Sequence, residues 1–299
     1  MSRACTTEGE FPRYTAMAVR PSPLLLIVLL VAGTPVVPLG AQTRHGVAYA
    51  RRFFRFGRRT VCAHVCTVDL CDASVAVRTT APSEGGRTVR SWARRVGAEV
   101  AVNGDYFDGR SLRPLGPSRG NGAWWAATLR EHRDALLGFS ADGDVHVLDA
   151  PAGASEALWP GIENDARVAT WTQLLAVRER ILVQGVARRS PRVPATEGRH
   201  PRTAVGLSRD RHTMAFVVVD GRGESGDGAT VSELASILGS VGMTEGMKLD
   251  GGGSSTMYVR GHGIVNRPSD GHERRVANHI GVVLQAASGV RPRCASGSE

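Results

Sequence analysis

Residues Lys248–Met257 read KLDGGGSSTM, and this stretch constrains the fold and the chemistry of the chain more than any other. An apolar approach ends in the carboxylate of Asp250, three glycines follow, and hydroxyl residues come next. Three glycines in a row cost backbone entropy, which makes sense where a chain turns sharply or a ligand approaches main-chain N–H groups. Successive N–H groups in such a turn can bind an anion. The same pattern also fits a tight turn between two strands.

Spacing excludes three common sites. A P-loop requires G-x-x-x-x-G-K-[ST], whereas the single lysine of the chain, Lys248, precedes the glycines. A dinucleotide fingerprint requires G-x-G-x-x-G at the start of a helix, but residues Ser254–Val259 (SSTMYV) predict a strand. A nucleophile elbow requires G-x-S-x-G, and neither Ser254 nor Ser255 has a glycine two residues later.

The composition is that of a globular protein with a basic charge balance. The chain has 299 residues, of which 42% are hydrophobic and 22% charged, with a formal net charge of +9. This length suits one large domain or two small ones. A basic protein favours anionic partners. Because aromatic and basic residues are not interleaved as in a nucleic-acid module, we expect no nucleic-acid partner and consider phosphate-bearing glycans instead.

Residues 17–41 have the features of a secretory signal. Arg20 supplies positive charge, Leu24–Val31 is an apolar run, and Gly40–Ala41 offers small residues for cleavage. The run is too short for a stable membrane span. We therefore expect a signal peptide over residues 1–41, with Met17 as an alternative start, and a secreted, periplasmic or cell-envelope protein.

Four cysteines follow the signal, and disulfides are expected in an oxidising compartment. They are Cys62, Cys66, Cys71 and Cys294, and three connectivities are open. Cys62 and Cys66 on one strand would lie about 13 Å apart at roughly 3.3 Å per residue, beyond disulfide reach. That pair is therefore the least favoured, and we expect Cys294 to tie the C-terminal tail back. A zinc site from these cysteines and His64 is disfavoured, because the paired ligand spacing is not repeated.

Hydrophobic spacing predicts more strands than helices. One helix is predicted over residues 88–96, closed by Gly97, and a second begins at a capping box formed by Thr230 and Glu233. Because no βαβ rhythm is visible, we expect one strand-rich α+β domain over residues 61–290, preceded by a loose basic lead-in at 42–60 and followed by a tail at 291–299. Strands are predicted at 61–77, 98–102, 124–129, 135–140, 145–148, 181–183, 203–207, 213–219, 254–259 and 280–285.

Five polar segments stand at the ends of hydrophobic pieces, where a rigid scaffold often presents a site. They are residues 103–107, 200–204, 220–223, the glycine segment that begins at Asp250, and residues 266–269. Together and in this order they resemble the phosphodiester glycosidase family. The resemblance runs from about Ala98 to Leu284 and rests on VNGDYFD, RPLG…NG, HPRTAVGLS, VVVDGRG, LDGGGSSTM and VNRPSDGHERRV. Asp105 stands where that family usually has a second glycine, and Lys248 where it usually has asparagine.

The resemblance implies hydrolysis of the glycosidic bond of a sugar-1-phosphate diester on a glycan or glycoconjugate. The sugar would leave free, and the phosphate would stay behind as a monoester. Asp250 and Asp220 are the candidate catalytic carboxylates, which would stabilise an oxocarbenium-like transition state, attack it or activate water. The other candidate contacts to substrate or phosphate are Asn103, Gly104, Arg202, Thr203, Arg222, Gly251, Gly252, Gly253, Ser254, Asn266 and Arg274, the arginines as bidentate clamps.

Several alternatives stay open at the level of sequence. No cofactor is required, but Asp250, Asp220 or Asn103 could hold a divalent cation. Asp220 also fits a turn after a strand, and Glu233 is fully explained as a helix cap. Two other functions fit the same residues, namely a catalytically inactive glycan-binding envelope protein and a phosphodiesterase that cleaves the P–O bond.

Overall fold

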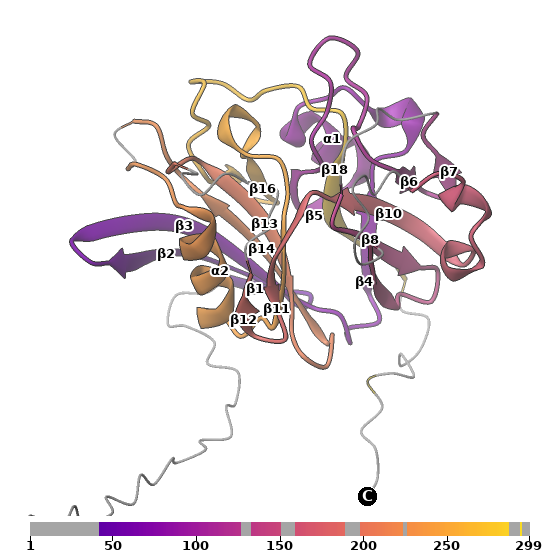
Figure 1. Cartoon of the computed structure of the whole chain (residues 1–299), viewed down its shortest axis with the longest axis horizontal. Coiled ribbons are helices and arrows are strands. Elements are labelled where there is room, and N and C mark those ends of the chain that lie inside the picture. Colours follow the sequence, from indigo (N-terminus) through magenta and orange to yellow (C-terminus); the bar gives the residue numbers. More distant parts are fainter. Residues whose placement is uncertain are drawn as a thin grey trace, which may run out of the picture. The chain divides into compact units, whose positions relative to one another are not determined.

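The computed structural model describes residues 42–126, 133–150, 159–188, 198–223, 226–286 and Cys294 (Figure 1). Within these residues the strands form three antiparallel sheets, accompanied by two α-helices and four short 3-10 helices. The predicted strand-rich α+β class is therefore confirmed. The predicted signal segment lies outside the described residues. No helix in the described part of the chain is long and apolar enough to cross a membrane.

The largest sheet has eight strands and carries helix α2 (Val231–Ser240) on one face. In spatial order its strands are β1 (Gln42–Arg44), β2 (Val47–Phe56), β3 (Arg59–Asp69), β14 (Thr213–Val219), β13 (Arg202–Leu207), β15 (Glu245–Lys248), β11 (Glu179–Val183) and β12 (Val186–Ala187).

Two smaller sheets have five strands each. The first is covered by helix α1 (Val89–Val96) and runs β17 (Gly263–Ile264), β16 (Met257–Val259), β5 (Ala98–Asn103), β18 (His279–Leu284) and β4 (Val75–Thr79). The second is backed by the 3-10 helices η2 (Ile162–Asn164) and η3 (Ala166–Val168) and runs β7 (Ala123–Trp124), β6 (Ser118–Gly120), β10 (Trp171–Val177), β8 (Ala135–Ser140) and β9 (Val145–Asp149). The remaining 3-10 helices are η1 (Pro82–Glu84) and η4 (Gly252–Ser254).

One hydrophobic core receives side chains from all three sheets. Phe216 and Met247 come from the eight-stranded sheet, Val102 and Ile280 from the sheet beneath α1, and Leu137 from the third sheet. The opposite face of each sheet is covered by α2, α1 or the η2–η3 segment. Strands covered on both faces read as continuous apolar runs. This explains why β8 and β14 are evident in the sequence without an alternating pattern.

The sequence misplaced one segment and missed others. Residues 42–60 are not a loose lead-in, because β2 pairs with β3 from Val47 opposite Val68 to Phe56 opposite Arg59. Exposed and half-buried residues alternate along β2, so its arginine-rich composition hides a strand with one solvated face. Strand β10 and the shorter strands β6, β12 and β17 had no counterpart among the predicted strands. The strand predicted at 254–259 begins only at Met257, because the glycine segment first forms η4.

The predicted helix boundaries and the tether of the tail are confirmed. The Thr88 hydroxyl accepts the Ser91 N–H at the start of α1, and Gly97 ends that helix with a φ of 72°. Cys294 is bonded to Cys71, so the C-terminal segment is tied to the turn after β3. Cys62 and Cys66 are buried and not disulfide-bonded to each other.

A buried histidine makes the stability of this fold depend on pH. His279 starts β18, and its ring stacks on Trp92 with centroids 5.0 Å apart. Its Nδ1 lies 2.9 Å from the Thr80 hydroxyl, and its Nε2 lies 3.1 Å from the Arg87 carbonyl oxygen. These contacts fit a neutral ring that donates from Nε2 and accepts at Nδ1. Burial lowers the pKa of His279 to about 3.

We expect the protein to lose stability as the pH falls below the ordinary histidine pKa of 6.5. Between pH 6.5 and 3 the unfolded chain binds a proton at residue 279 that the folded chain excludes. Taken alone, this proton should cost about 2 kcal/mol when the pH falls from 6.5 to 5, while the buried Asp105, whose pKa is raised to about 6, acts in the opposite direction. In urea unfolding across this range, the wild type should therefore lose about 2 kcal/mol more, or gain about 2 kcal/mol less, than His279→Gln. Replacing the exposed His45 by Gln is the control, and an equal slope in His279→Gln would contradict the assignment.

Candidate functional site

Four strands bring the predicted polar segments to one edge. The start of β13 lies beside the end of β14, since Arg202 pairs with Val219. The end of β15 lies on the other side of β13, since Lys248 pairs with Ala204. The end of β5 joins them because the backbone N–H of Asp250 donates to the Gly104 carbonyl at 3.0 Å.

Asn103 fastens these strand ends to one another. Its Nδ2 donates to the Asp250 carbonyl at 2.8 Å, and its Oδ1 accepts the Thr203 hydroxyl at 2.7 Å and the Thr256 N–H at 3.3 Å. A buried amide bonded to three segments fixes their relative positions. The structure thus shows that Asn103 and Thr203 hold these strand ends together. Their contact with substrate stays a prediction.

The glycine segment is a turn whose main-chain donors are largely engaged within the protein. Gly251 N–H donates to Asp250 Oδ1 at 2.8 Å, and Gly252 N–H donates to the Pro201 carbonyl at 2.9 Å. The N–H groups of residues 254–255 donate to carbonyls within the turn. Gly252 has a φ of 62°, which glycine adopts without strain. Since these four N–H groups are occupied, we expect side chains to make the main contacts with an anion.

Two predicted arginines lie directly over this turn. A Cβ placed on Gly252 would come within 3.3 Å of Arg222 Nη1, and one on Gly253 would come within 2.2 Å of Arg274 Nη2. The glycines therefore leave the space that the guanidinium groups occupy. Arg274 also donates to Asp270 Oδ2 at 2.6 Å and lies 3.5 Å from the Ser254 hydroxyl. Arg222 is exposed and Arg274 has 43% of its side chain exposed, so both can meet a ligand.

Asp250 begins the same turn and is hydrogen-bonded within it. Burial raises the pKa of its carboxyl, while hydrogen bonds from Ser254 and Gly251 and the positive charge of Arg274 act in the opposite direction. The carboxylate is thus held in one orientation by the turn, and the Arg274 guanidinium and the Lys248 ammonium lie near enough to act on it. This arrangement can bind an anionic group of a ligand and place the Asp250 carboxylate next to the ligand atom that is bonded to that group.

Arg202 has a different environment from the other two arginines. Its side chain is only 3% exposed, and it donates to the Ala229 carbonyl from Nε at 3.0 Å and to the Gly198 carbonyl from Nη2 at 2.8 Å. Arg202 therefore braces the chain around residues 198 and 229. Its contact with a phosphate stays a prediction, and Arg222 and Arg274 are better exposed for that role.

Asp220 is buried at the end of β14 and is held on both carboxylate oxygens. Oδ1 accepts the Arg267 N–H at 2.8 Å, and Oδ2 lies 3.1 Å from His64 Nε2. The neighbouring Asn266 accepts the Met257 N–H at 2.7 Å, so this loop is bonded both to Asp220 and to the strand that follows the glycine turn. The sequence did not reveal His64 as a partner. The available signal was a histidine within an otherwise apolar strand.

Glu233 is confirmed as a helix cap. Its carboxylate accepts the Thr230 N–H at 2.9 Å, and the Thr230 hydroxyl accepts the Glu233 N–H at 3.2 Å. Arg199 pairs with the same carboxylate. These contacts account for the charge of Glu233 without a catalytic role.

Glu233→Gln is therefore expected to keep near-normal turnover with a small change in stability. Glutamine can still accept the Thr230 N–H, whereas Thr230→Ala removes the hydroxyl of the box and should cost about 1 kcal/mol. Thermal unfolding and turnover should be measured on both variants. A loss of turnover by orders of magnitude at unchanged melting temperature in Glu233→Gln would identify a catalytic acid instead.

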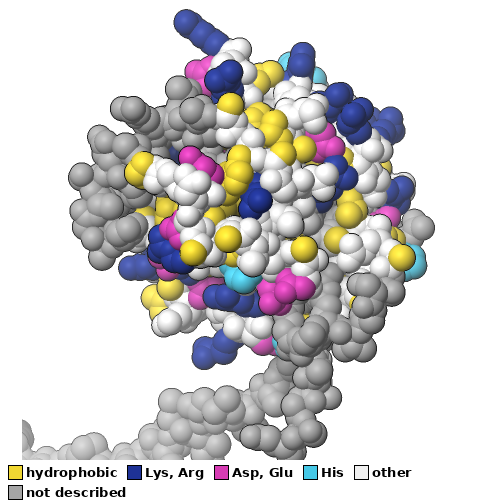
Figure 2. All heavy atoms as spheres, turned by 90° about the vertical axis from the view of Figure 1, so that its right-hand side faces the viewer, with side chains coloured by type: hydrophobic (Ala, Val, Ile, Leu, Met, Phe, Trp, Pro, Cys, Tyr) yellow, Lys and Arg dark blue, Asp and Glu magenta, His cyan; other side chains and the backbone are white. Residues whose placement is uncertain are grey.

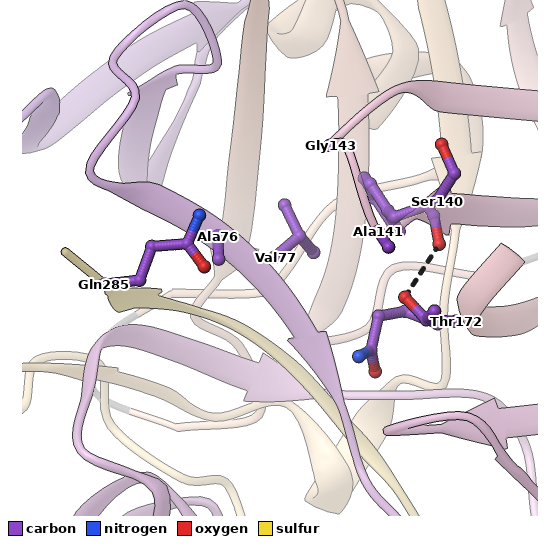
Figure 3. Close-up of a pocket in the computed structure, with 9 residues that line it drawn as sticks. Ala76, Val77, Ser140, Ala141, Gly143, Thr172 and Gln285 are labelled. Atoms are coloured by element: carbon purple, nitrogen blue, oxygen red, sulfur yellow. Dashed lines mark hydrogen bonds between the residues drawn. The ribbon is translucent and has the colours of Figure 1, made fainter. Parts of the chain in front are cut away.

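A pocket on another part of the molecule is unrelated to this site. It lies between β4, the β8–β9 turn and the start of β10, with Ala76, Ser140, Thr172 and Gln285 on its walls (Figure 3). None of the described residues that line it is charged. Its lining therefore offers hydroxyl and amide groups but no charged side chain to pair with a phosphate or to act as an acid or base.

Comparison with known proteins identifies the family. Residues 96–283 match the phosphodiester glycosidase family, and the chain belongs to it. An uncharacterized SPbeta prophage-derived protein of Bacillus subtilis (strain 168), YomE, is 39% identical over 82 residues, which cover 27% of this chain and 12% of that protein.

Solved structures share the fold. The zebrafish N-acetylglucosamine-1-phosphodiester alpha-N-acetylglucosaminidase catalytic domain, auto-inhibited by its pro-peptide, has a TM-score of 0.63 at 19% identity, covering 80% of this chain and 83% of that one. A hypothetical protein from Synechocystis has a TM-score of 0.59 at 15% identity, covering 80% of this chain and 62% of that one. A protein described as exported, from Burkholderia pseudomallei K96243, has a TM-score of 0.55 at 19% identity, covering 75% and 74%.

The two departures from the usual family pattern both have partners inside this chain. Asp105 Oδ2 lies 3.0 Å from Arg133 Nε, and both side chains are fully buried. Lys248 pairs with the buried Glu179, and its Nζ lies 5.3 Å from the centre of the Tyr106 ring. Buried charges are tolerated when they are paired. The sequence did not predict these pairs, because each joins residues from separate segments of the chain.

Proposed function

We propose that this chain is a secreted or cell-envelope hydrolase that cleaves the glycosidic C–O bond of a sugar-1-phosphate diester on a glycan or glycoconjugate. The observation that carries the proposal is the position of Asp250 against the glycine turn, with the guanidinium groups of Arg222 and Arg274 over that turn. Membership in the phosphodiester glycosidase family supports it.

The arrangement suits the charges that develop during this reaction. A phosphodiester carries one negative charge, which Arg222 and Arg274 would bind through charge-assisted hydrogen bonds. The anomeric carbon would then lie beside Asp250, whose carboxylate stabilises the oxocarbenium-like transition state, attacks it or activates water. A phosphate leaving group needs less protonation than an alkoxide, so one essential carboxylate suffices. Water supplies the new C–O bond, and the products are a free sugar and a phosphomonoester.

An inactive binding protein with the same fold is the alternative to an active enzyme. The charges of Asp105 and Lys248 each have an opposite partner within the fold, which either protein would need in order to fold. Turnover of a sugar-1-phosphate diester by the purified protein separates the two functions.

Isotope placement distinguishes glycosidase from phosphodiesterase chemistry. We would incubate the protein with the methyl ester of N-acetylglucosamine-1-phosphate in oxygen-18 water and locate the label by mass spectrometry. Cleavage of the C–O bond places the label in the sugar, which is the expected result. Label in the phosphate would identify cleavage of the P–O bond and overturn the proposal.

Location outside the cytoplasm is part of the same proposal. The Cys71–Cys294 disulfide fits an oxidising compartment. The apolar run at Leu24–Val31 and the likeness to a Burkholderia protein described as exported agree with it. N-terminal sequencing of the exported protein should find a start near Gln42, and an intact N-terminus on cytoplasmic protein would contradict it.

The surface charge agrees with a localised anionic ligand. Arginines are dispersed over the face shown in Figure 2 and lie among acidic and neutral groups. A nucleic-acid-binding surface needs a continuous basic patch or stripe. The view therefore gives no support for a nucleic-acid partner on this face.

Arg222→Lys is expected to weaken substrate binding by about tenfold or more. Lysine keeps the positive charge but loses the planar fork that can hold two phosphate oxygens, and one charged hydrogen bond contributes roughly 1.5–3 kcal/mol. The measurement is kcat/KM with the diester substrate. Arg95→Lys at the exposed end of α1 is the matched control, and wild-type kcat/KM in Arg222→Lys would remove Arg222 from the site.

A further inference from the structure

A thiol, an imidazole and a carboxylate meet on the buried face of the eight-stranded sheet. One ligand atom each from Cys62, His64 and Asp220 lies within 4.8 Å of the other two, and all three residues are buried. His64 Nε2 lies 3.1 Å from Asp220 Oδ2. The proposed glycosidase chemistry assigns no role to Cys62 or His64.

The sheet register places these three side chains together. Cys62 and His64 are two residues apart on β3, so they point to the same face. Val219 at the end of β14 pairs with Ala63, and the following Asp220 donates its N–H to the Cys62 carbonyl at 3.2 Å. Two neighbouring strands therefore present three metal-binding groups from a rigid scaffold.

We propose that Cys62, His64 and Asp220 form a binding site for a divalent cation of borderline softness, of which Zn²⁺ is the type. A thiolate, an imidazole nitrogen and a carboxylate oxygen are the three ligand kinds that zinc takes in proteins. Oxygen-preferring Mg²⁺ and Ca²⁺ do not select a thiolate. Three protein ligands leave one position of a tetrahedral ion for water or a small ligand.

The surroundings of His64 match those of a metal-binding histidine. Tyr49 Oη lies 2.9 Å from His64 Nδ1, on the side of the ring away from Asp220. When Nε2 binds the cation, Nδ1 carries the proton and donates it to Tyr49. Such an outer hydrogen bond fixes the tautomer and the orientation of a metal-binding ring.

An exposed arginine contacts the thiol of Cys62. Arg51 lies on β2 and donates from Nε to Cys62 Sγ at 3.2 Å. Because Arg51 is exposed, its side chain can swing into solvent when a cation takes its place at the sulfur. Cys62 and Asp220 as anions would then neutralise the charge of the divalent ion.

The sequence argument against zinc used only the spacing of the cysteines and His64 along the chain. The third ligand comes from Asp220, which is 156 residues from His64 along the chain. A second group, formed by Cys71, His212 and Cys294, is closed to this chemistry because its two sulfurs form the disulfide.

Cobalt titration tests the proposal by a readout that does not depend on turnover. The chelator-treated protein, with its disulfide intact and without reductant or affinity tag, would be titrated with Co²⁺ under nitrogen. We expect one equivalent to produce a thiolate-to-cobalt charge-transfer band in the near ultraviolet, and Zn²⁺ to remove it. Absence of the band would overturn the site even if the protein is an active glycosidase, and its presence would stand even if the protein is inactive.

Variants assign the ligands. Cys62→Ser should abolish the band, whereas Cys66→Ser, on the same face of β3 but outside the cluster, should retain it. Tyr49→Phe should weaken Zn²⁺ binding by roughly 10- to 100-fold, the range for loss of an outer hydrogen bond to a ligand. An unchanged band in Cys62→Ser, or its loss only in Cys66→Ser, would overturn the assignment. If Cys62→Ser does not fold, X-ray absorption of the wild-type zinc complex decides, because the proposal requires one sulfur together with nitrogen and oxygen ligands.

Discussion

Asp250→Asn is expected to lower turnover of a sugar-1-phosphate diester by about a hundredfold or more, the scale for loss of a principal acid–base group. Asparagine preserves the shape of the side chain and can still accept the Gly251 N–H, which Asp250 Oδ1 accepts at 2.8 Å. It removes the negative charge that opposes an anion in the ground state and stabilises positive charge at the anomeric carbon in the transition state. Binding of the substrate should therefore be kept or tightened while kcat falls.

Three measurements separate this role from bracing of the turn. The melting temperature should change little, the affinity for the unreacted diester should not weaken, and kcat should fall. Asp142→Asn, in the exposed turn between β8 and β9, is the matched control and should behave as the wild type. Normal turnover in Asp250→Asn would leave Asp250 as a brace only. If that variant unfolds, Asp220→Asn becomes the next test of the catalytic carboxylate.

The sequence predicted which polar segments stand at strand ends, because strand ends and the glycine segment are local patterns, whereas their role as a site stays a prediction. Asp250 comes two residues after the short strand β15, and Asn103 ends β5. Turn residues after such strands mark where strands stop, and the order of the segments matched a known family. The structure then brought Asn103, Thr203 and Asp250 together through hydrogen bonds.

Roles within the site could not be predicted in the same way, because they depend on burial and on pairing between distant segments. Three arginines stood equal in the sequence, yet Arg202 is buried on two carbonyls while Arg222 and Arg274 lie over the glycines. His64 meets Asp220 only through the register of β3 with β14. Strand order and register in an antiparallel sheet depend on the packing of the whole core. They therefore cannot be predicted from a local sequence pattern.

The second large effect concerns stability. Arg133→Met is expected to destabilise the protein by about 3–5 kcal/mol, because it leaves the Asp105 carboxylate buried without its charged partner. The two side chains are fully buried, and Nε of Arg133 lies 3.0 Å from Oδ2 of Asp105. Methionine fills a similar volume with apolar atoms. The loss should therefore arise mainly from the charge of Asp105 and not from a cavity.

The pH dependence of this loss follows from the pKa of Asp105. Burial raises that pKa to about 6 although Arg133 acts to lower it, so removing Arg133 raises it further. A carboxyl whose pKa is higher in the folded than in the unfolded state destabilises the fold when it is ionised. The destabilisation by Arg133→Met should thus be larger at pH 8 than at pH 5, where the carboxyl becomes protonated.

Urea unfolding of single and double variants at both pH values tests this account. Asp105→Asn combined with Arg133→Met removes both charges, so it should be more stable than Arg133→Met alone and should lose the difference between pH 8 and pH 5. Arg95→Met at the exposed end of α1 controls for loss of an arginine and should change stability by less than about 0.5 kcal/mol. If the single and double variants are equally destabilised at both pH values, the loss of stability arises from packing around Arg133. In that case the burial of the Asp105 carboxylate does not require the charge of Arg133.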